Sequence, residues 1–87
     1  MTSRPAVLAA FCDAVNALKK TALDPERIDP ALYLGGDLGI DSIEMLEIWF
    51  RIERAVGGRI PDDAKRDIYT VGEVADVVAG HCPAVTA

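Results

Sequence analysis

The sequence predicts an all-α fold: one domain over residues 1–87 with four helices, a short third helix and a long loop between the first two. Apolar residues recur at helical spacing in three segments, and helix-start and helix-end residues separate them. No segment shows the alternating pattern of a strand. The chain has 87 residues, 51% of them hydrophobic and 6% aromatic, so we expect one small core that is mostly aliphatic.

The first helix is predicted over about residues 5–21. Its apolar positions have helical spacing and are Val7, Phe11, Val15 and Leu18. Lys19 and Lys20 in the last turn complement the helix dipole, and Pro25 prevents continuation of the helix.

The segment 24–41 is predicted to be a long irregular loop. It contains two prolines and three glycines, and such loops are functional or packed on themselves. Four apolar residues are expected to hold it against the core: Ile28, Leu32, Leu34 and Leu38.

Three further helices are predicted after the loop, over about residues 42–56, 62–68 and 71–79. Gly57 and Gly58 end the first of these as a left-handed C-cap. Asp62 and Asp63 begin the short helix. Thr70 and Glu73 form a capping box that opens the last one, which is expected to end at Gly80, followed by a frayed tail over 81–87.

The residues 37–44, with sequence DLGIDSIE, place Ser42 where the long loop ends and the second helix begins. Asp41 and Ser42 are typical of a helix start in any protein, because their side chains accept hydrogen bonds from the first turn. Asp41 with Glu44 also fits a capping box. Capping requires neither Asp37 nor Gly39. The segment resembles the signature D-L-G-x-D-S-L/I of the acyl carrier protein family, and the helix pattern extends the resemblance to nearly the whole chain.

The resemblance implies that Ser42 carries a 4′-phosphopantetheine arm whose thiol holds an acyl group as a thioester. It implies that Asp41, Asp37 and Gly39 belong to the same cofactor site. Acidic groups are tolerated near a helix N-terminus, and glycine lets the backbone turn closely there. A serine is a weak nucleophile without a base beside it, and none is adjacent. The chain is therefore expected to lack catalytic activity, and the resemblance implies that a phosphopantetheinyl transferase modifies it.

The helix that follows Ser42 has an apolar arc and a polar stripe. The arc is expected to face the bundle and comprises Met45, Leu46, Ile48, Trp49, Ile52 and Val56. The stripe comprises Glu44, Glu47, Arg51 and Arg54, with Glu47 and Arg51 at a supportive i,i+4 spacing. Ile43 and Phe50 lie at the border of the arc, on the side of the stripe. The resemblance implies that partner enzymes dock on this helix through Ile43, Glu44, Glu47 and Phe50, next to Arg51 and Arg54.

The two arginines depart from the strongly acidic second helix of the family. Their position at the C-terminal half suits the helix dipole. It also predicts a mismatch with partners that bind an all-acidic helix, so we hypothesise a specialised carrier with its own partners. Trp49 is interpreted as core packing or as the lining of an acyl-chain cavity. Glu53 falls inside the apolar arc, and the sequence gives no reason for it.

Charge and cysteine content narrow the remaining classes of function. The net charge of −5 disfavours nucleic-acid binding and suits a partner with a basic docking surface. Cys12 and Cys82 do not form a disulfide framework, and His81 beside Cys82 is too few ligands for a metal site. No apolar run approaches the ~20 residues of a membrane span. We expect a cytoplasmic monomer, and the resemblance implies that its partners are acyl-loading enzymes, ketosynthases or acyltransferases.

Several alternatives stay open at this point. A peptidyl carrier typically has L-G-G-H/D-S, and residues 34–37 read Leu-Gly-Gly-Asp, but Ser42 comes five residues after Asp37. This position of the serine favours a carrier of fatty-acid, polyketide or specialised lipid synthesis over a peptidyl carrier. A D-alanyl carrier is a less favoured alternative. An unmodified helical interaction module is a different class. A hydrolase lacks a Ser/His/Asp constellation. The initiating methionine and short tails favour a free-standing carrier.

Overall fold

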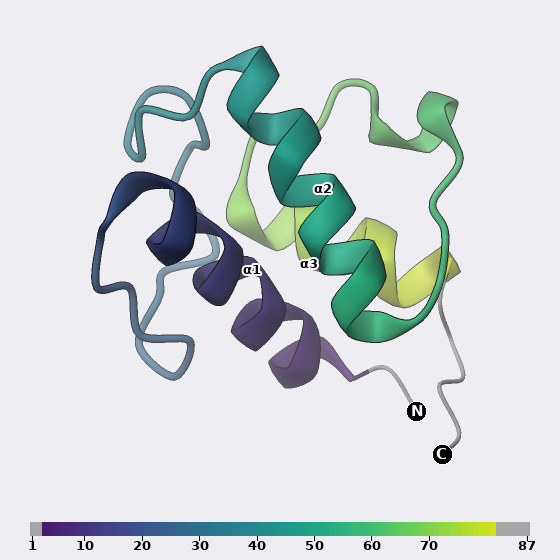
Figure 1. Cartoon of the computed structure of the whole chain (residues 1–87), viewed down its shortest axis with the longest axis horizontal. Helices are drawn as coiled ribbons and strands as arrows, with labels where there is room; N and C mark the ends of the chain where they lie inside the picture. Colours follow the sequence, from purple (N-terminus) through teal and green to yellow (C-terminus); the bar gives the residue numbers. More distant parts are fainter. Residues whose placement is uncertain (1–2, 82–87) are drawn as a thin grey trace.

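The computed structural model describes residues 3–81 and confirms the all-α prediction, with three α-helices and one short 3₁₀-helix (Figure 1). In chain order these are α1 (Arg4–Lys19), α2 (Ser42–Val56), η1 (Asp62–Lys65) and α3 (Val71–His81). Within residues 3–81, no strand forms beyond an isolated bridge between Tyr33 and Thr70. The predicted frayed tail, with Cys82, lies outside the described residues from residue 82 onward.

Helix α1 begins and ends at residues that satisfy its free backbone groups. The hydroxyl of Ser3 accepts a hydrogen bond from the Ala6 amide at 3.2 Å, and Pro5 is favoured in a first turn. Lys20 adopts a left-handed conformation with φ of 55°. The helix therefore stops at Lys19, two residues earlier than predicted.

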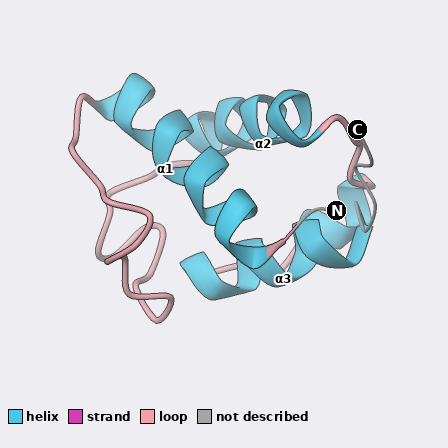
Figure 2. Cartoon of the chain, turned by 90° about the horizontal axis from the view of Figure 1, so that it is seen from below, coloured by secondary structure: helices cyan, strands magenta, loops and turns pink. Residues whose placement is uncertain are grey.

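The long loop between α1 and α2 is held against the core, as predicted. Leu34 is buried, and Ile28, Leu32 and Leu38 are partly buried and pack on the core. The loop also bonds to the start of α3, because the Leu34 amide donates to the Tyr69 carbonyl at 2.8 Å and the Val71 amide donates to the Leu32 carbonyl at 3.1 Å. Figure 2 shows this loop as a pink trace that joins α1 to α2 at one end of the molecule.

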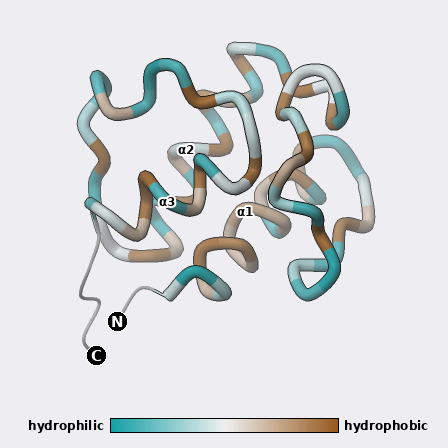
Figure 3. The backbone as a smooth tube through the Cα atoms, turned by 180° about the vertical axis from the view of Figure 1, so that it is seen from behind, coloured by the Kyte–Doolittle hydropathy of each residue, from teal (hydrophilic) through white to brown (hydrophobic). Residues whose placement is uncertain are grey.

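The core lies among the three α-helices, and α1 packs against both α2 and α3. Its largest fully buried side chains include Phe11, Ile48, Ile52, Val74 and Val78. Along each helix the hydrophobic residues are interrupted by hydrophilic ones (Figure 3), as expected for amphipathic helices that bury one face.

The predicted count of four helices is not confirmed. The third helix, predicted over 62–68, is a single 3₁₀ turn that ends at Lys65. Arg66 is extended, and Asp67 has a left-handed φ of 58°, so the backbone cannot continue as a helix. Helix α3 also runs past Gly80, since glycine in a last turn weakens a helix without ending it.

Two side chains of α2 lie differently from the helical-wheel expectation. Leu46 was expected to face the bundle and is 68% exposed, so it lies outside the part of α2 that the rest of the molecule covers. Glu53 lies inside the arc because its carboxylate has partners there. It accepts a hydrogen bond from the Ile60 amide at 2.7 Å and pairs with Lys65 at 3.5 Å, and so holds the segment after α2 in place.

Candidate functional site

Ser42 is the first residue of α2, and it is exposed. The helix is capped by Asp41, whose carboxylate accepts from the Glu44 amide at 2.8 Å, while the Glu44 carboxylate accepts from the Asp41 amide at 3.1 Å. The predicted capping box is confirmed. Among the side-chain hydrogen bonds of the described residues, none uses the Ser42 hydroxyl. Asp41 supplies the cap of α2, so the Ser42 hydroxyl does not serve as the helix cap.

The turn before Ser42 depends on Gly39 and Asp37. Gly39 has a left-handed φ of 67°, and a Cβ there would meet nothing within 4 Å, so its backbone conformation alone favours glycine. The Asp37 carboxylate accepts from the Tyr33 amide at 2.7 Å, and the Asp37 amide donates to the Tyr33 carbonyl at 3.1 Å. Asp37 therefore closes the turn that leads to the serine. Its contribution to a cofactor site stays a prediction.

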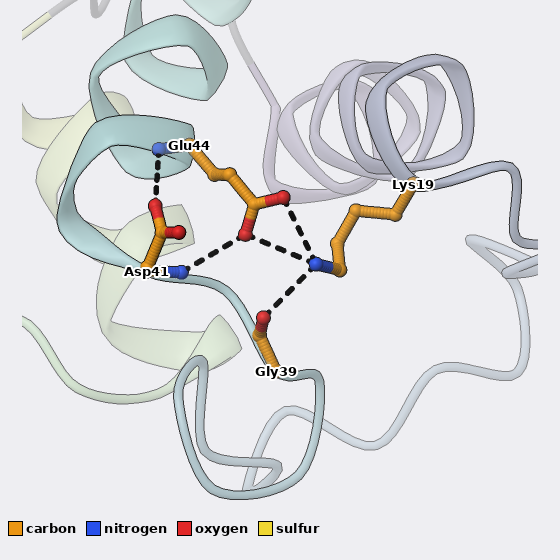
Figure 4. Close-up of polar contacts among 4 residues, drawn as sticks. All are labelled: Lys19, Gly39, Asp41 and Glu44. Carbon is orange, nitrogen blue, oxygen red and sulfur yellow. Dashed lines mark hydrogen bonds and ion pairs between the residues drawn. The ribbon is translucent and has the colours of Figure 1, made fainter.

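Lys19 joins three segments at this site, as Figure 4 shows. Its ammonium donates to the Gly39 carbonyl and to both carboxylate oxygens of Glu44, each at 3.0 Å. The Lys19 and Glu44 side chains are only 23% and 26% exposed. From the sequence, Lys19 was expected only to complement the dipole of the first helix. No local pattern signals a contact between residues 25 positions apart.

An open groove borders Ser42 between the end of the loop and the segment before α3. Its lining is mostly apolar and includes Leu34, Ile40, Met45 and Ile68, with Tyr69 at one side. Tyr69 donates a hydrogen bond to Asp67 at 3.1 Å, which raises the pKa of the Tyr69 hydroxyl and keeps it protonated. Because Ser42 also lines this mostly apolar groove, a flexible chain attached to its hydroxyl would lie next to apolar surface.

The outer face of α2 carries an apolar stripe, which we define as Ile43, Leu46 and Phe50. These side chains are 79%, 68% and 52% exposed. The predicted exposure of Ile43 and Phe50 is confirmed, whereas that of Leu46 was missed because the wheel placed it in the arc.

Charged groups border this apolar stripe. Arg51 pairs with Glu47 at 2.9 Å, as its i,i+4 spacing predicted, and the guanidinium of Arg54 lies 5.6 Å from the centre of the Phe50 ring. Glu44 differs from Glu47 in the partner of its carboxylate. The Glu44 carboxylate is bound by Lys19 of α1, whereas Glu47 pairs with Arg51 of the same helix.

Trp49 is buried, at 4% exposed, which confirms the core-packing interpretation. The Lys65 ammonium lies 5.8 Å from the centre of its ring. The alternative interpretation, in which Trp49 lines an acyl-chain cavity, stays a prediction.

Comparison with known proteins identifies the family. Residues 6–78 match the family model described as "Phosphopantetheine attachment site". The chain is 34% identical over 80 residues to an acyl carrier protein of Myxococcus xanthus, which covers 92% of this chain and 99% of that protein. It is 35% identical over 79 residues to an acyl carrier protein of Renibacterium salmoninarum, covering 91% and 95%. The chain belongs to the acyl carrier protein family.

Acyl carrier proteins are carriers without catalytic activity of their own, and their covalently attached prosthetic group is 4′-phosphopantetheine. The geometry around Ser42 fits this group in two respects. The serine is exposed and does not cap the helix, and an apolar groove lies beside it. Within residues 3–81, no helix is both long enough and apolar enough to span a membrane.

Proposed function

We propose that the chain tethers acyl intermediates as thioesters on a 4′-phosphopantetheine arm attached to Ser42. One observation carries the proposal. Asp41 provides the helix cap, so Ser42 stands exposed at the first turn of α2 with a hydroxyl that makes no side-chain hydrogen bond among residues 3–81. A serine placed there only to cap the helix would have its hydroxyl on the amides of the first turn.

In the attachment reaction this chain supplies the nucleophile, and the transferase binds coenzyme A and supplies the base. The Ser42 hydroxyl oxygen bonds to the coenzyme A phosphorus that bears pantetheine, the pyrophosphate P–O bond breaks, and adenosine 3′,5′-bisphosphate leaves. The proton of the hydroxyl passes to a base of the transferase. The His81 ring nitrogen lies 3.0 Å from the Val77 carbonyl at the end of α3, and Asp41 serves as the cap. The transferase therefore supplies the base.

In this proposal Asp41, Asp37 and Gly39 act on the presentation of the serine. Asp41 fixes the first turn of α2, Asp37 closes the turn before it, and Gly39 provides the left-handed residue between them. The arm is then attached at a defined helix end, next to the apolar groove.

Intact mass spectrometry tests the attachment site. After incubation with coenzyme A and a broad-specificity phosphopantetheinyl transferase, the wild-type chain should gain the mass of one phosphopantetheine. Ser42→Ala should gain none. Ser3→Ala is a matched control, since Ser3 is the only other serine and also stands at a helix start; it should be loaded like wild type. A wild-type chain that stays unmodified beside a carrier loaded in the same tube would instead indicate a helical interaction module.

We further propose that partner enzymes of fatty-acid, polyketide or specialised lipid synthesis dock on α2. The apolar stripe of Ile43, Leu46 and Phe50 is exposed next to Ser42, and Glu47 lies beside it. Exposed apolar residues among charges are typical of interaction sites. We place this exchange in the cytoplasm, with the chain acting as a monomer.

Arg51 and Arg54 are proposed to select the partner. A docking face with positive charge at its C-terminal half repels a partner whose surface is basic throughout. The double variant Arg51→Glu/Arg54→Glu should therefore transfer acyl groups less well with its own synthase and better with a general fatty-acid synthase. Acyl transfer rates measured for both enzymes at two salt concentrations check this. An unchanged preference between the two synthases would reject the role.

A further inference from the structure

The Lys19 ammonium is the meeting point of α1, the long loop and α2. It donates to one oxygen of the loop, the Gly39 carbonyl, and to the Glu44 carboxylate at the first turn of α2. The same carboxylate accepts from the Asp41 amide. A single side chain thus connects the three residues before Ser42 to the first turn of the helix that Ser42 opens (Figure 4).

We propose that Lys19 is a positioning residue for phosphopantetheine attachment, which holds the segment 39–41 and α2 in the arrangement that presents the Ser42 hydroxyl. This inference rests on the proposed function for its role in loading. The ion pair itself is a feature of the fold and can be tested separately.

The contacts explain why one lysine can have this effect. The end of the loop has two backbone hydrogen bonds to earlier residues of the same loop. The Gly39 amide donates to the Gly35 carbonyl at 3.0 Å, and the Ile40 amide donates to the Leu34 carbonyl at 2.9 Å. These bonds fold the turn on itself but do not connect it to α1. Through its ammonium, Lys19 links the turn to a helix of the core.

The ion pair between Lys19 and Glu44 is also partly shielded from solvent, so it can contribute to holding the segment before Ser42. Both side chains are less than a third exposed, so solvent screens their attraction less than on an open surface. Bonds between an ammonium and a carboxylate are stronger than neutral ones. Removal of Lys19 leaves the Glu44 carboxylate with the Asp41 amide as its remaining donor, and leaves the Gly39 carbonyl without the Lys19 ammonium.

The arrangement gives Glu44 a different role from the docking contact that the sequence predicted. Its carboxylate is occupied inside the molecule, and a basic group of a partner must compete with Lys19 to reach it. Contact with Glu44 would therefore disturb the segment next to Ser42, whereas contact with Glu47 would not.

Three variants separate the ion pair from other effects. Lys19→Met keeps the length of the side chain and removes the charge. Glu44→Gln removes the charge and keeps an acceptor for the capping box, where glutamine is also accepted. Lys20→Met is the control, because the next residue along the chain is exposed and has none of these contacts.

Amide hydrogen exchange followed by NMR tests the positioning without any cofactor. Lys19→Met should speed exchange at Asp41 and Ile40 at least several-fold, while amides of the core helices, such as Ile52, exchange as in wild type. Lys20→Met should match wild type throughout. Unchanged exchange at Asp41 in Lys19→Met would overturn the proposal.

Loading kinetics with a phosphopantetheinyl transferase test the functional part. Lys19→Met and Glu44→Gln should each lower kcat several-fold with little change in KM, and the double variant should be no worse than either alone, because both remove one interaction. Lys19→Arg should restore most of kcat, since arginine can bond a carboxylate and a carbonyl together. Faster exchange at Asp41 with an unchanged kcat would overturn the role in loading. If the wild-type chain is not loaded at all, the proposed function and this role in loading both fail, and the exchange data still decide whether Lys19 orders the turn.

Discussion

Gly39 and Gly80 differ in whether their backbone angles favour glycine over other residues. Gly39 has a φ of 67°, in the left-handed region, whereas Gly80 lies inside α3 and adopts helical angles. Neither would crowd a neighbour with an added Cβ, since nothing lies within 4 Å of either position. Any difference between their alanine variants therefore reports backbone conformation alone.

Gly39→Ala should lower the free energy of unfolding by about 1–2 kcal/mol, which is the cost of a left-handed conformation for a residue with a Cβ. Gly80→Ala should raise it by about 0.5–1 kcal/mol, because alanine is favoured over glycine in a helix. Urea denaturation followed by circular dichroism measures both. Equal effects at the two positions would contradict the backbone explanation.

Individual residues were predictable from the sequence where their contacts are local. The capping box of Asp41 and Glu44 spans three positions, and its pattern alone indicated both hydrogen bonds. Lys19 was placed correctly near the end of a helix, but its contact with Glu44 depends on how α1 packs against α2. Neither helix encodes that crossing in its own sequence.

At the scale of elements, α2 is stabilised at its C-terminal end by a contact with the segment that follows. Glu53 accepts from the Ile60 amide and pairs with Lys65, and its side chain is 18% exposed. Glu47, six residues earlier, forms an exposed pair with Arg51 on the outer face. The same residue type thus has a structural role at one position and a surface role at the other.

Glu53→Ala should destabilise the fold by about 1–3 kcal/mol, because it leaves the amide of buried Ile60 without its acceptor. Glu47→Ala should change stability by no more than about 0.5 kcal/mol, as is typical of exposed helix pairs. Thermal and urea unfolding of both variants check this difference. If Glu47→Ala proves the more harmful of the two, the account of Glu53 is wrong.

The extent of the elements was predictable where caps and apolar spacing agree, as for α2, whose predicted bounds match the structure. The third helix was overestimated because acidic residues such as Asp62 mark a helix start in both α- and 3₁₀-helices. Its end is set by the extended Arg66 and the left-handed Asp67, conformations that the sequence does not signal. The exposure of Leu46 likewise depends on how much of α2 its neighbours cover.

At the scale of the whole molecule, Cys12 is a thiol enclosed by the core. It is 0% exposed, and burial, with smaller contributions from Asp13 and Asp24, raises the pKa of Cys12 from 9.0 to about 11. The folded chain therefore keeps this thiol protonated at pH values where the unfolded chain ionises it. Its contribution to stability is fully present below about pH 9 and is lost as the pH rises toward about 11.

The free energy of unfolding should accordingly fall more steeply between about pH 9 and about pH 11 in the wild-type chain than in Cys12→Ala. Tyrosines and lysines titrate in the same range in both proteins, so the difference between the two slopes isolates the thiol. Urea denaturation at a series of pH values measures it. Parallel pH profiles would show that ionisation of Cys12 is not linked to unfolding.

The backbone bonds between the long loop and the start of α3 have a consequence for how the chain folds. The Gly72 amide donates to the Pro30 carbonyl at 2.8 Å, and Leu34 and Val71 contribute the neighbouring bonds. These partners lie some forty positions apart along the chain, and contacts of such long range form late because the intervening loop must first close. The packing of α3 on α1 spans even more of the chain, so we expect α3 to dock and to form these bonds together, late in folding. The neighbourhood of Ser42 would then be among the last parts of the molecule to become ordered, so a nascent chain would acquire its attachment site only after α3 has emerged and docked.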